Sequence, residues 1–223
     1  MNAMRSAFAS LLLLGLWGCR SPIKPYPDSP VRTRKESYAF LGHPDPAWFP
    51  GIKFDVHVPL TNNFYAFAGP FDGPKAFDLR VAPVRRWDLE TSAEALRQME
   101  TLAADLPTKV IPKLIQQEKA LFWHVSESAP YRLEIRLLDL KLTSPMAEAA
   151  KSVFLNSIPG DQALLDLKFV DKATGRVLAA AHTFTVPDLD VERQIADCIQ
   201  IFLDRTEAHI KRGAGLPVSS QGA

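Results

Sequence analysis

The sequence lacks the short motifs that identify most classes of enzyme. Its 223 residues contain no G-x-S-x-G, H-E-x-x-H, P-loop, C-x-x-C or dinucleotide-binding fingerprint. The histidines are scattered and no two of them stand at a metal-ligand spacing: they are His43, His57, His124, His182 and His209. We therefore predict a protein that is not an enzyme and that has no metal, no other cofactor and no catalytic residue.

The sequence also lacks an excess of charge of either sign. There are 26 lysines and arginines against 25 aspartates and glutamates. A nucleic-acid-binding domain gathers basic charge on its surface, and this composition supplies no such excess. No nucleic-acid partner is predicted.

No hydrophobic run reaches the about 20 apolar residues that a membrane-spanning helix needs. The most apolar run, residues 7–17, follows a short segment with one positive charge at Arg5 and is followed by Gly18 and Cys19. A positive start, a short apolar core and a small residue are typical of a cleaved signal peptide. We expect residues 1–18 to be removed.

The last four residues of this region, Leu16-Trp17-Gly18-Cys19, resemble the lipobox of bacterial lipoproteins. The resemblance implies diacylglyceryl transfer to the Cys19 thiol, cleavage after Gly18 and acylation of the new terminus. Two or three acyl chains, at about 0.8 kcal/mol per buried methylene, would then hold the protein on a membrane of the cell envelope. Arg20 stands where an aspartate retains some lipoproteins in the inner membrane, so the resemblance favours the outer membrane. A secreted protein with an unmodified Cys19 is the alternative.

Lipidation of Cys19 would leave Cys198 without an intrachain partner, so no structural disulfide is predicted. Cys198 lies between Ile195 and Phe202 in an apolar stripe, which indicates a small buried thiol and not a nucleophile. Removal of residues 1–18 takes away one charged residue and leaves 25 basic against 25 acidic residues.

Two segments are predicted before the main domain. Residues 19–36 are rich in proline and carry five basic against two acidic residues, which predicts an extended, lipid-anchored tether of polyproline character. Residues 37–76 hold nine of the chain's 21 aromatic residues and a predicted hairpin, residues 53–58 into 64–67. These aromatics indicate either a platform for sugar or peptide or the packed cover of a sheet.

The main domain is predicted over residues 77–213. It begins with an alternating strand, and Thr91 with Glu94 three residues later forms a capping box for a long helix. Pro107 and Pro112 are expected to break or kink this helix.

A short strand over residues 121–125 and a long strand over 131–142 come next. The apolar phase of the long strand changes between Leu137 and Leu138, which predicts a bulge or a passage from one packing layer to another. Ser144-Pro145 is expected to open a short helix.

Residues 162–170 and 176–186 predict a β-hairpin, with Gly175 at the left-handed position of its turn. The apolar residues of its first strand are expected to face the core, and Asp166 and Lys168 to face the other way.

A last helix is predicted from the acidic residues near position 190 to Lys211-Arg212-Gly213, followed by a disordered tail over residues 214–223. The predicted fold class is thus α+β: a mixed, largely antiparallel sheet of about five strands packed by two helices, with an aromatic-rich N-terminal extension.

The order of elements over residues 77–212 resembles small α/β envelope lipoproteins, such as auxiliary lipoproteins of ABC transporters and relatives of the curli-secretion lipoprotein. Three segments carry the resemblance: residues 121–125, residues 130–135 and residues 166–178, which contain a D-x-x-T-G turn. The resemblance implies an accessory or assembly role without catalysis.

Two classes of function remain. In the first, the anchored domain is a binding or assembly module that docks an envelope protein through a strand edge or the aromatic segment. In the second, it is an envelope hydrolase with an unrecognised site, for which paired carboxylates would be needed. The candidates for such a pair are Asp78, Asp88, Asp139 and Asp171.

Overall fold

The computed structural model describes five stretches of the chain, residues 24–72, 75–117, 123–142, 161–186 and 190–213. Four predictions fall outside them: the signal peptide over residues 1–18, the lipidation of Cys19, the helix opened by Ser144-Pro145 and the tail over residues 214–223. The described elements are α2 (Arg34–Leu41), β1 (Val56–Val58), β2 (Asn63–Phe67), β3 (Ala76–Val81), α3 (Ala93–Asp105), the π-helical turn η1 (Leu106–Val110), α4 (Ile111–Gln117), β4 (His124–Val125), β5 (Tyr131–Lys141), β6 (Gln162–Asp171), β7 (Val177–Phe184) and α6 (Val191–Gly213).

The strands form one mixed sheet in the order β1-β2-β7-β6-β5-β3-β4. Strand β3 runs parallel to β4 and β5, and the other neighbours are antiparallel. The predicted α+β class with a mixed, largely antiparallel sheet is confirmed. The expected number of about five strands is wrong, because the hairpin of the aromatic segment, β1 and β2, joins the same sheet through β7 and brings the total to seven.

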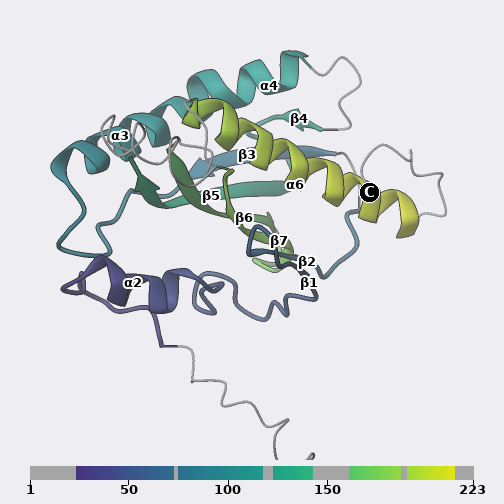
Figure 1. Cartoon of the computed structure of the whole chain (residues 1–223). Coiled ribbons are helices and arrows are strands. Elements are labelled where there is room, and N and C mark those ends of the chain that lie inside the picture. Colours follow the sequence, from purple (N-terminus) through teal and green to yellow (C-terminus); the bar gives the residue numbers. More distant parts are fainter. Residues whose placement is uncertain (1–23, 73–74, 118–122, 143–160, 187–189, 214–223) are drawn as a thin grey trace, which may run out of the picture.

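One face of the sheet is covered by the run α3–η1–α4 and by α6 (Figure 1). The run α3–η1–α4 and α6 correspond to the two predicted helices, since α3, η1 and α4 follow one another without a break. The expected number of two helices is too low, because α2 packs on the sheet as well. Their apolar stripes pack on alternate residues of β5 and β6, and the largest core cluster lies between them. None of the described helices combines the length and the hydropathy that crossing a membrane would take.

The first of these helices differs from the prediction in its first residue and in the structure at Pro107. Ser92, not Thr91, is the N-cap and accepts a hydrogen bond from the amide of Ala95. Pro107 does not end the helix, because the chain widens there into a π-helical turn in which the amide of Ile111 donates to the carbonyl of Leu106. Such a turn relieves the clash of a proline ring with the preceding turn.

The opposite face of the sheet is covered by the N-terminal segment, which we define as residues 24–52 and which includes α2 (Figure 1). Phe40 and Leu41 of α2 pack on Trp87 and on the sheet residues Leu138 and Leu164. Further along the segment, a second cluster on this face combines Phe49 with Ala66, Val177 and Ala180. The sheet is therefore the middle of three layers.

This covering layer corrects two expectations. Residues 24–36 are not an extended tether, since Val31 pairs with Asp88 in a parallel bridge and Thr33 caps α2 with a capping box. The aromatics of residues 37–76 mostly pack against the sheet: Phe40, Phe49, Tyr65 and Phe71 are all buried. Of the two interpretations of this segment, the structure favours the packed cover.

Strand β5 contains the predicted bulge. Leu137 is opposite Leu165 and Asp139 is opposite Leu164, so Leu138 is the extra residue between them. Leu138 packs under α2, whereas Leu140 returns to the helix side, where Leu133, Ile135 and Leu137 also lie. The bulge is what turns Asp139 toward the N-terminal segment.

The hairpin of β6 and β7 is confirmed, and Gly175 has the expected positive φ of 71°. Asp166 and Lys168 lie on the face away from the helices, as predicted. Both are buried, because the N-terminal segment covers this face as well.

Candidate functional site

A row of ionisable side chains crosses the covered face of the sheet and forms the most distinctive chemical feature of the described chain. The strand register places Arg136 of β5 opposite Asp166 of β6, and Asp166 opposite His182 of β7. Arg136 Nη2 lies 2.5 Å from Asp166 Oδ2, and His182 Nδ1 lies 2.7 Å from Asp166 Oδ1. We call these three residues the charged row.

The charged row is almost completely removed from water. The side chain of Arg136 is 13% exposed, and those of Asp166 and His182 are 0% exposed. Burying charge is costly unless each charge is paired and hydrogen-bonded, and Asp166 meets this condition with a partner on either side. Nε2 of His182 is buried and has no hydrogen-bond partner among the described residues.

The N-terminal segment completes the pairing from the other side. Asp45 accepts hydrogen bonds from both terminal nitrogens of Arg136 through one oxygen, at 3.1 Å each. The Trp48 ring lies 4.4 Å from the Arg136 guanidinium and 3.9 Å from Lys168 Nζ, a cation–π arrangement with both. Lys168 Nζ also donates to the carbonyl of Trp48 at 2.8 Å and pairs with Glu134 at 3.2 Å.

Tyr26 fixes the beginning of the segment in the same place. Its ring packs on Phe40 and Trp87, and its hydroxyl donates to the carbonyl of His43 at 2.9 Å. Burial, and after it the charge of Asp166, raise the pKa of the Tyr26 hydroxyl, so this group stays protonated and remains a donor.

Helix α2 is held by a second ionic contact at the bulge of β5. Asp139 accepts from Arg34 Nη2 at 2.5 Å and from the Tyr38 hydroxyl at 2.6 Å. Burial, followed by the charge of Asp139, raises the pKa of Tyr38. The N-terminal segment is thus attached at three places: at Tyr26, at Arg34 and Tyr38 of α2, and at Asp45. We call these contacts together the ionic clamp.

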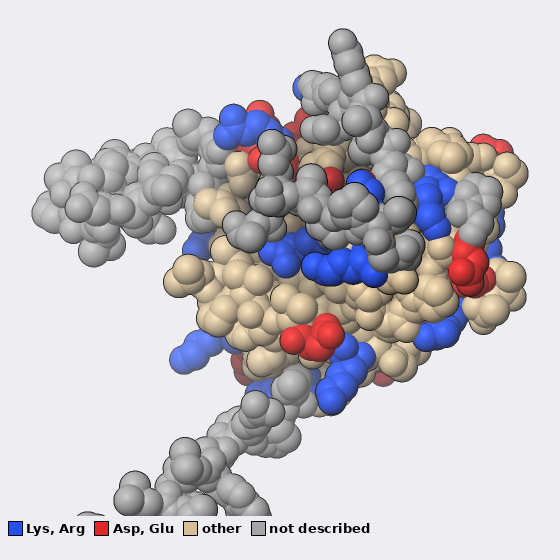
Figure 2. Space-filling model, turned by 90° about the vertical axis from the view of Figure 1, so that its right-hand side faces the viewer, with Lys and Arg blue, Asp and Glu red and all other residues tan. Residues whose placement is uncertain are grey.

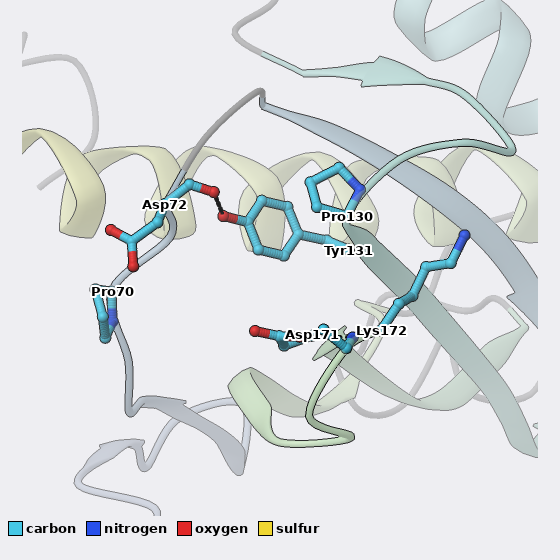
Figure 3. A pocket seen from close by; sticks show the side chains of 7 residues that line it. Pro70, Asp72, Pro130, Tyr131, Asp171 and Lys172 are labelled. Carbon is cyan, nitrogen blue, oxygen red and sulfur yellow. Dashed lines mark hydrogen bonds between the residues drawn. The ribbon is translucent and has the colours of Figure 1, made fainter.

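A pocket of about 400 Å³ opens at one end of the sheet (Figure 3). It lies between the loop before β3, the start of β5 and the β6–β7 turn, and its lining comprises Pro70, Asp72, Pro130, Tyr131, Asp171, Lys172 and Ala173. In Figure 3 the Tyr131 hydroxyl points to the main-chain carbonyl of Asp72, to which it donates a hydrogen bond. Burial, then the nearby charge of Asp72, raises the pKa of Tyr131.

Asp171 and Lys172 of this pocket have structural partners. Asp171 Oδ1 accepts from the amides of Ala173 at 2.8 Å and Thr174 at 3.0 Å, which closes the turn. Lys172 Nζ donates to the carbonyl of Glu127 at 2.8 Å. The pocket can accept a small polar molecule, but its groups are arranged to hold three loops together.

A second hollow, of about 460 Å³, lies where the described chain begins. Its lining combines Lys24, Pro25, Pro27, Val31, Arg32, Glu36 and Phe40. Two basic side chains, Lys24 and Arg32, therefore border an apolar floor at the beginning of the described chain.

The four carboxylates considered for a hydrolase each have structural partners. Asp88 accepts from Thr91 and Ser37 inside the domain, and Asp139 holds Arg34 and Tyr38. Asp78 forms ion pairs with Arg132 and Lys172. Asp171 accepts a hydrogen bond within its own turn.

The remaining candidates lie as follows. Cys198 is half-buried on α6, and burial raises the pKa of its thiol to about 11, which fits the predicted inert thiol. Three of the scattered histidines, His43, His57 and His182, gather around the ring of Phe64. In the part of the chain that the structure describes, no group of three or more His, Cys, Asp or Glu side chains could hold a metal ion.

Sequence reasoning missed the charged row and its partner Asp45. Arg136, Asp166 and Lys168 alternate with apolar residues, and this pattern is typical of a strand with one solvated face. The sequence around His182 gave a weak signal. His182 directly follows Ala179, Ala180 and Ala181, and small residues on both faces of a strand indicate that both faces are covered.

Comparison with known proteins adds little. No protein-family model matches the chain, and no curated protein matches it in sequence. Two solved structures of PelC dodecamers from Paraburkholderia phytofirmans share part of the arrangement. One has 10% sequence identity and a TM-score of 0.37 and covers 65% of this chain and 92% of the PelC chain. The other has 12% identity and a TM-score of 0.36, with 61% and 89% covered. TM-scores this low decide neither the fold nor the assembly of this chain.

Proposed function

We propose that this chain is a lipoprotein of the bacterial cell envelope, anchored through acylated Cys19 and carried on the outer membrane in preference to the inner one. Its domain acts without catalysis, as a binding, accessory or assembly module for an envelope protein. The proposal involves no nucleic acid, metal or cofactor.

The observation that carries the proposal is the attachment of the chain directly after the lipobox. From Tyr26 onward the chain is fixed to the sheet by aromatic packing, by the Val31–Asp88 bridge and by the ionic clamp. Only residues 20–23 separate Cys19 from the described body. A chain end that is clamped in this way suits an anchor, because a pull on Cys19 reaches the domain through directional bonds.

The pocket chemistry supports a role without catalysis. Four polar side chains line the pocket in Figure 3: Asp72, Tyr131, Asp171 and Lys172. The last three each hold a loop or turn through a hydrogen bond, which leaves Asp72 as the candidate for a reactive group. A partner protein would dock elsewhere. Strand β4 at the sheet edge is one such place, since His124 and Val125 are both exposed.

The test is expression with the chain's own N-terminus in a bacterial host, followed by membrane flotation and intact mass. We expect the wild type to lose residues 1–18, to gain the mass of two or three acyl chains and to float with outer-membrane vesicles. Cys19→Ala should lose both properties, whereas Cys198→Ala, the matched control at the other cysteine, should keep them. A wild type that is cleaved, soluble and unmodified would refute the proposal and leave a secreted protein.

The hydrolase alternative has its own test. If the pocket in Figure 3 cleaved a glycan, the purified protein would release reducing ends from cell-wall polysaccharide, and Asp72→Asn would abolish the release. We expect no release by either protein.

A further inference from the structure

We propose that the surface around Lys24 and the tip of the β1–β2 hairpin rests on the phospholipid surface in which the acyl chains of Cys19 are held. This inference rests on the proposed function, because it takes the acylation of Cys19 as given. It adds which face of the domain meets the membrane and which side chains make the contact.

The short connection decides which face lies near the bilayer. Five Cα-to-Cα steps join Cys19 to Lys24, and at about 3.3–3.6 Å per residue they span at most about 18 Å. A domain of this size has a radius of gyration of about 16 Å, so its diameter exceeds the connection. The domain therefore cannot turn its far side to the membrane, and the surface around Lys24 must lie close to it.

This surface carries charge of the appropriate sign for phospholipid phosphates. Lys24 and Arg32 border the hollow of about 460 Å³ and are both exposed. Glu36 is also exposed in the hollow, and its carboxylate accepts from the amide and hydroxyl of Thr33 at the start of α2, so two cations border the hollow beside one anion. Figure 2 shows several Lys and Arg side chains along the lower border of the described body.

The tip of the β1–β2 hairpin presents an exposed apolar side chain. Leu60 is 99% exposed, which is unusual for a leucine, and it sits between β1 and β2. Asn62 of the same turn donates to the carbonyl of Gly42 at 3.1 Å, and Tyr26 donates to the carbonyl of the next residue, His43. The hairpin tip and the beginning of the described chain are therefore hydrogen-bonded to two consecutive residues, Gly42 and His43.

Together these features match the chemistry of a bilayer interface. Basic side chains pair with headgroup phosphates, and an exposed apolar side chain enters the boundary between headgroups and acyl chains. The occupant of this surface is then the membrane itself, and the anchor and the contact act on the same side of the domain.

The test measures which exposed position touches the hydrocarbon. Acylated protein is reconstituted into vesicles of phosphatidylethanolamine and phosphatidylglycerol in which part of the lipid carries brominated acyl chains, which quench a nearby tryptophan. The variants are Leu60→Trp and, as the matched control, Ile201→Trp on α6, which lies on the other face of the sheet and is 44% exposed. After subtraction of the parent protein's signal, we expect the new tryptophan at position 60 to lose at least half of its fluorescence and that at position 201 to lose almost none.

A charge variant tests the second part of the contact. In the Leu60→Trp background, Lys24→Glu with Arg32→Glu should reduce the quenching at least twofold, whereas Arg97→Glu with Lys109→Glu on the helical face should leave it unchanged. Equal quenching at positions 60 and 201, or no effect of the Lys24 and Arg32 changes, would overturn the inference while the protein still floats with the vesicles. Protein without acyl mass that does not float would instead refute the proposed function, and the inference with it.

Discussion

Replacement of Arg136 by methionine should be among the most destabilising single changes in the charged row. Methionine keeps much of the apolar stem but removes the guanidinium, which is 13% exposed and pairs with both Asp45 and Asp166. The change leaves two buried carboxylates without their common partner and removes the cation that lies 4.4 Å from Trp48. Removing one member of a buried ion pair costs about 3–5 kcal/mol, and we expect Arg136→Met to lower the free energy of unfolding by about this amount. Domains are stable by only about 5–15 kcal/mol, so the loss is a large share of the total.

Urea unfolding followed by tryptophan fluorescence measures this loss. With a denaturant slope of about 2 kcal/mol/M, a loss of about 4 kcal/mol lowers the unfolding midpoint by about 2 M. Arg97→Met is the matched control, because Arg97 is a 72% exposed arginine on α3 that pairs only with Glu94. Its replacement should change the free energy of unfolding by no more than about 0.5 kcal/mol.

A small effect would refute the reasoning. If Arg136→Met lowered the free energy of unfolding by less than about 1 kcal/mol at an unchanged slope, the charged row would not be paired as described. A double-mutant cycle with Asp45→Asn separates the contribution of the N-terminal segment to the free energy of unfolding from the contribution of the sheet. We expect the two changes together to cost at least about 1 kcal/mol less than the sum of the single changes, because Asp45 and Arg136 share one contact.

Two further predictions concern the hairpin and the thiol. Gly175→Ala should lower the free energy of unfolding by about 1 kcal/mol in the same urea assay, because φ is 71° at this position while no other atom obstructs a Cβ; no loss would contradict the left-handed turn. Burial raises the pKa of Cys198 to about 11, so about one thiol in a thousand is ionised at pH 8, and iodoacetamide should alkylate the native protein roughly 100-fold more slowly than the urea-unfolded chain. The native rate should rise as the pH approaches 11. Since the unfolded thiol ionises near pH 8.5 and the folded one near 11, Cys198 also lowers stability as the pH rises through this interval, and Cys198→Ala should remove this part of the pH dependence.

The sequence predicted the elements whose signal is local. The Gly175 turn, the bulge beside Leu138 and the apolar stripe of α6 each depend on neighbouring residues, and each is present in the structure. The pairing of the aromatic hairpin with β7 was not predictable in this way. It joins Phe64 to His182, residues far apart in the chain, and no periodicity within either segment encodes that partner.

The covered face of the sheet was missed for a physical reason. A charged residue in an alternating strand faces water in most sheets, so Asp166 and Lys168 indicate a solvated face. The burial of these residues depends on Asp45 and Trp48, which belong to the aromatic-rich residues 37–76, a segment for which the sequence left a binding platform and a packed cover both open. The charged row can be recognised only when the sheet and the N-terminal segment are considered together, because the sequence of each alone is typical of solvent-exposed structure.

The two faces of the sheet are held by different forces, and this difference suits the anchoring near the N-terminus that we propose. The helices α3, α4 and α6 are held by apolar packing, which is strong but has little directional preference. The N-terminal segment is held by smaller apolar clusters together with ion pairs and hydrogen bonds of fixed geometry, at Tyr26, Arg34 and Asp45 in chain order. A pull from Cys19 would meet these contacts one after another before it reached a strand. The core between the sheet and the helices would then stay outside the path of the force, and the domain would keep its shape while the clamp takes the tension.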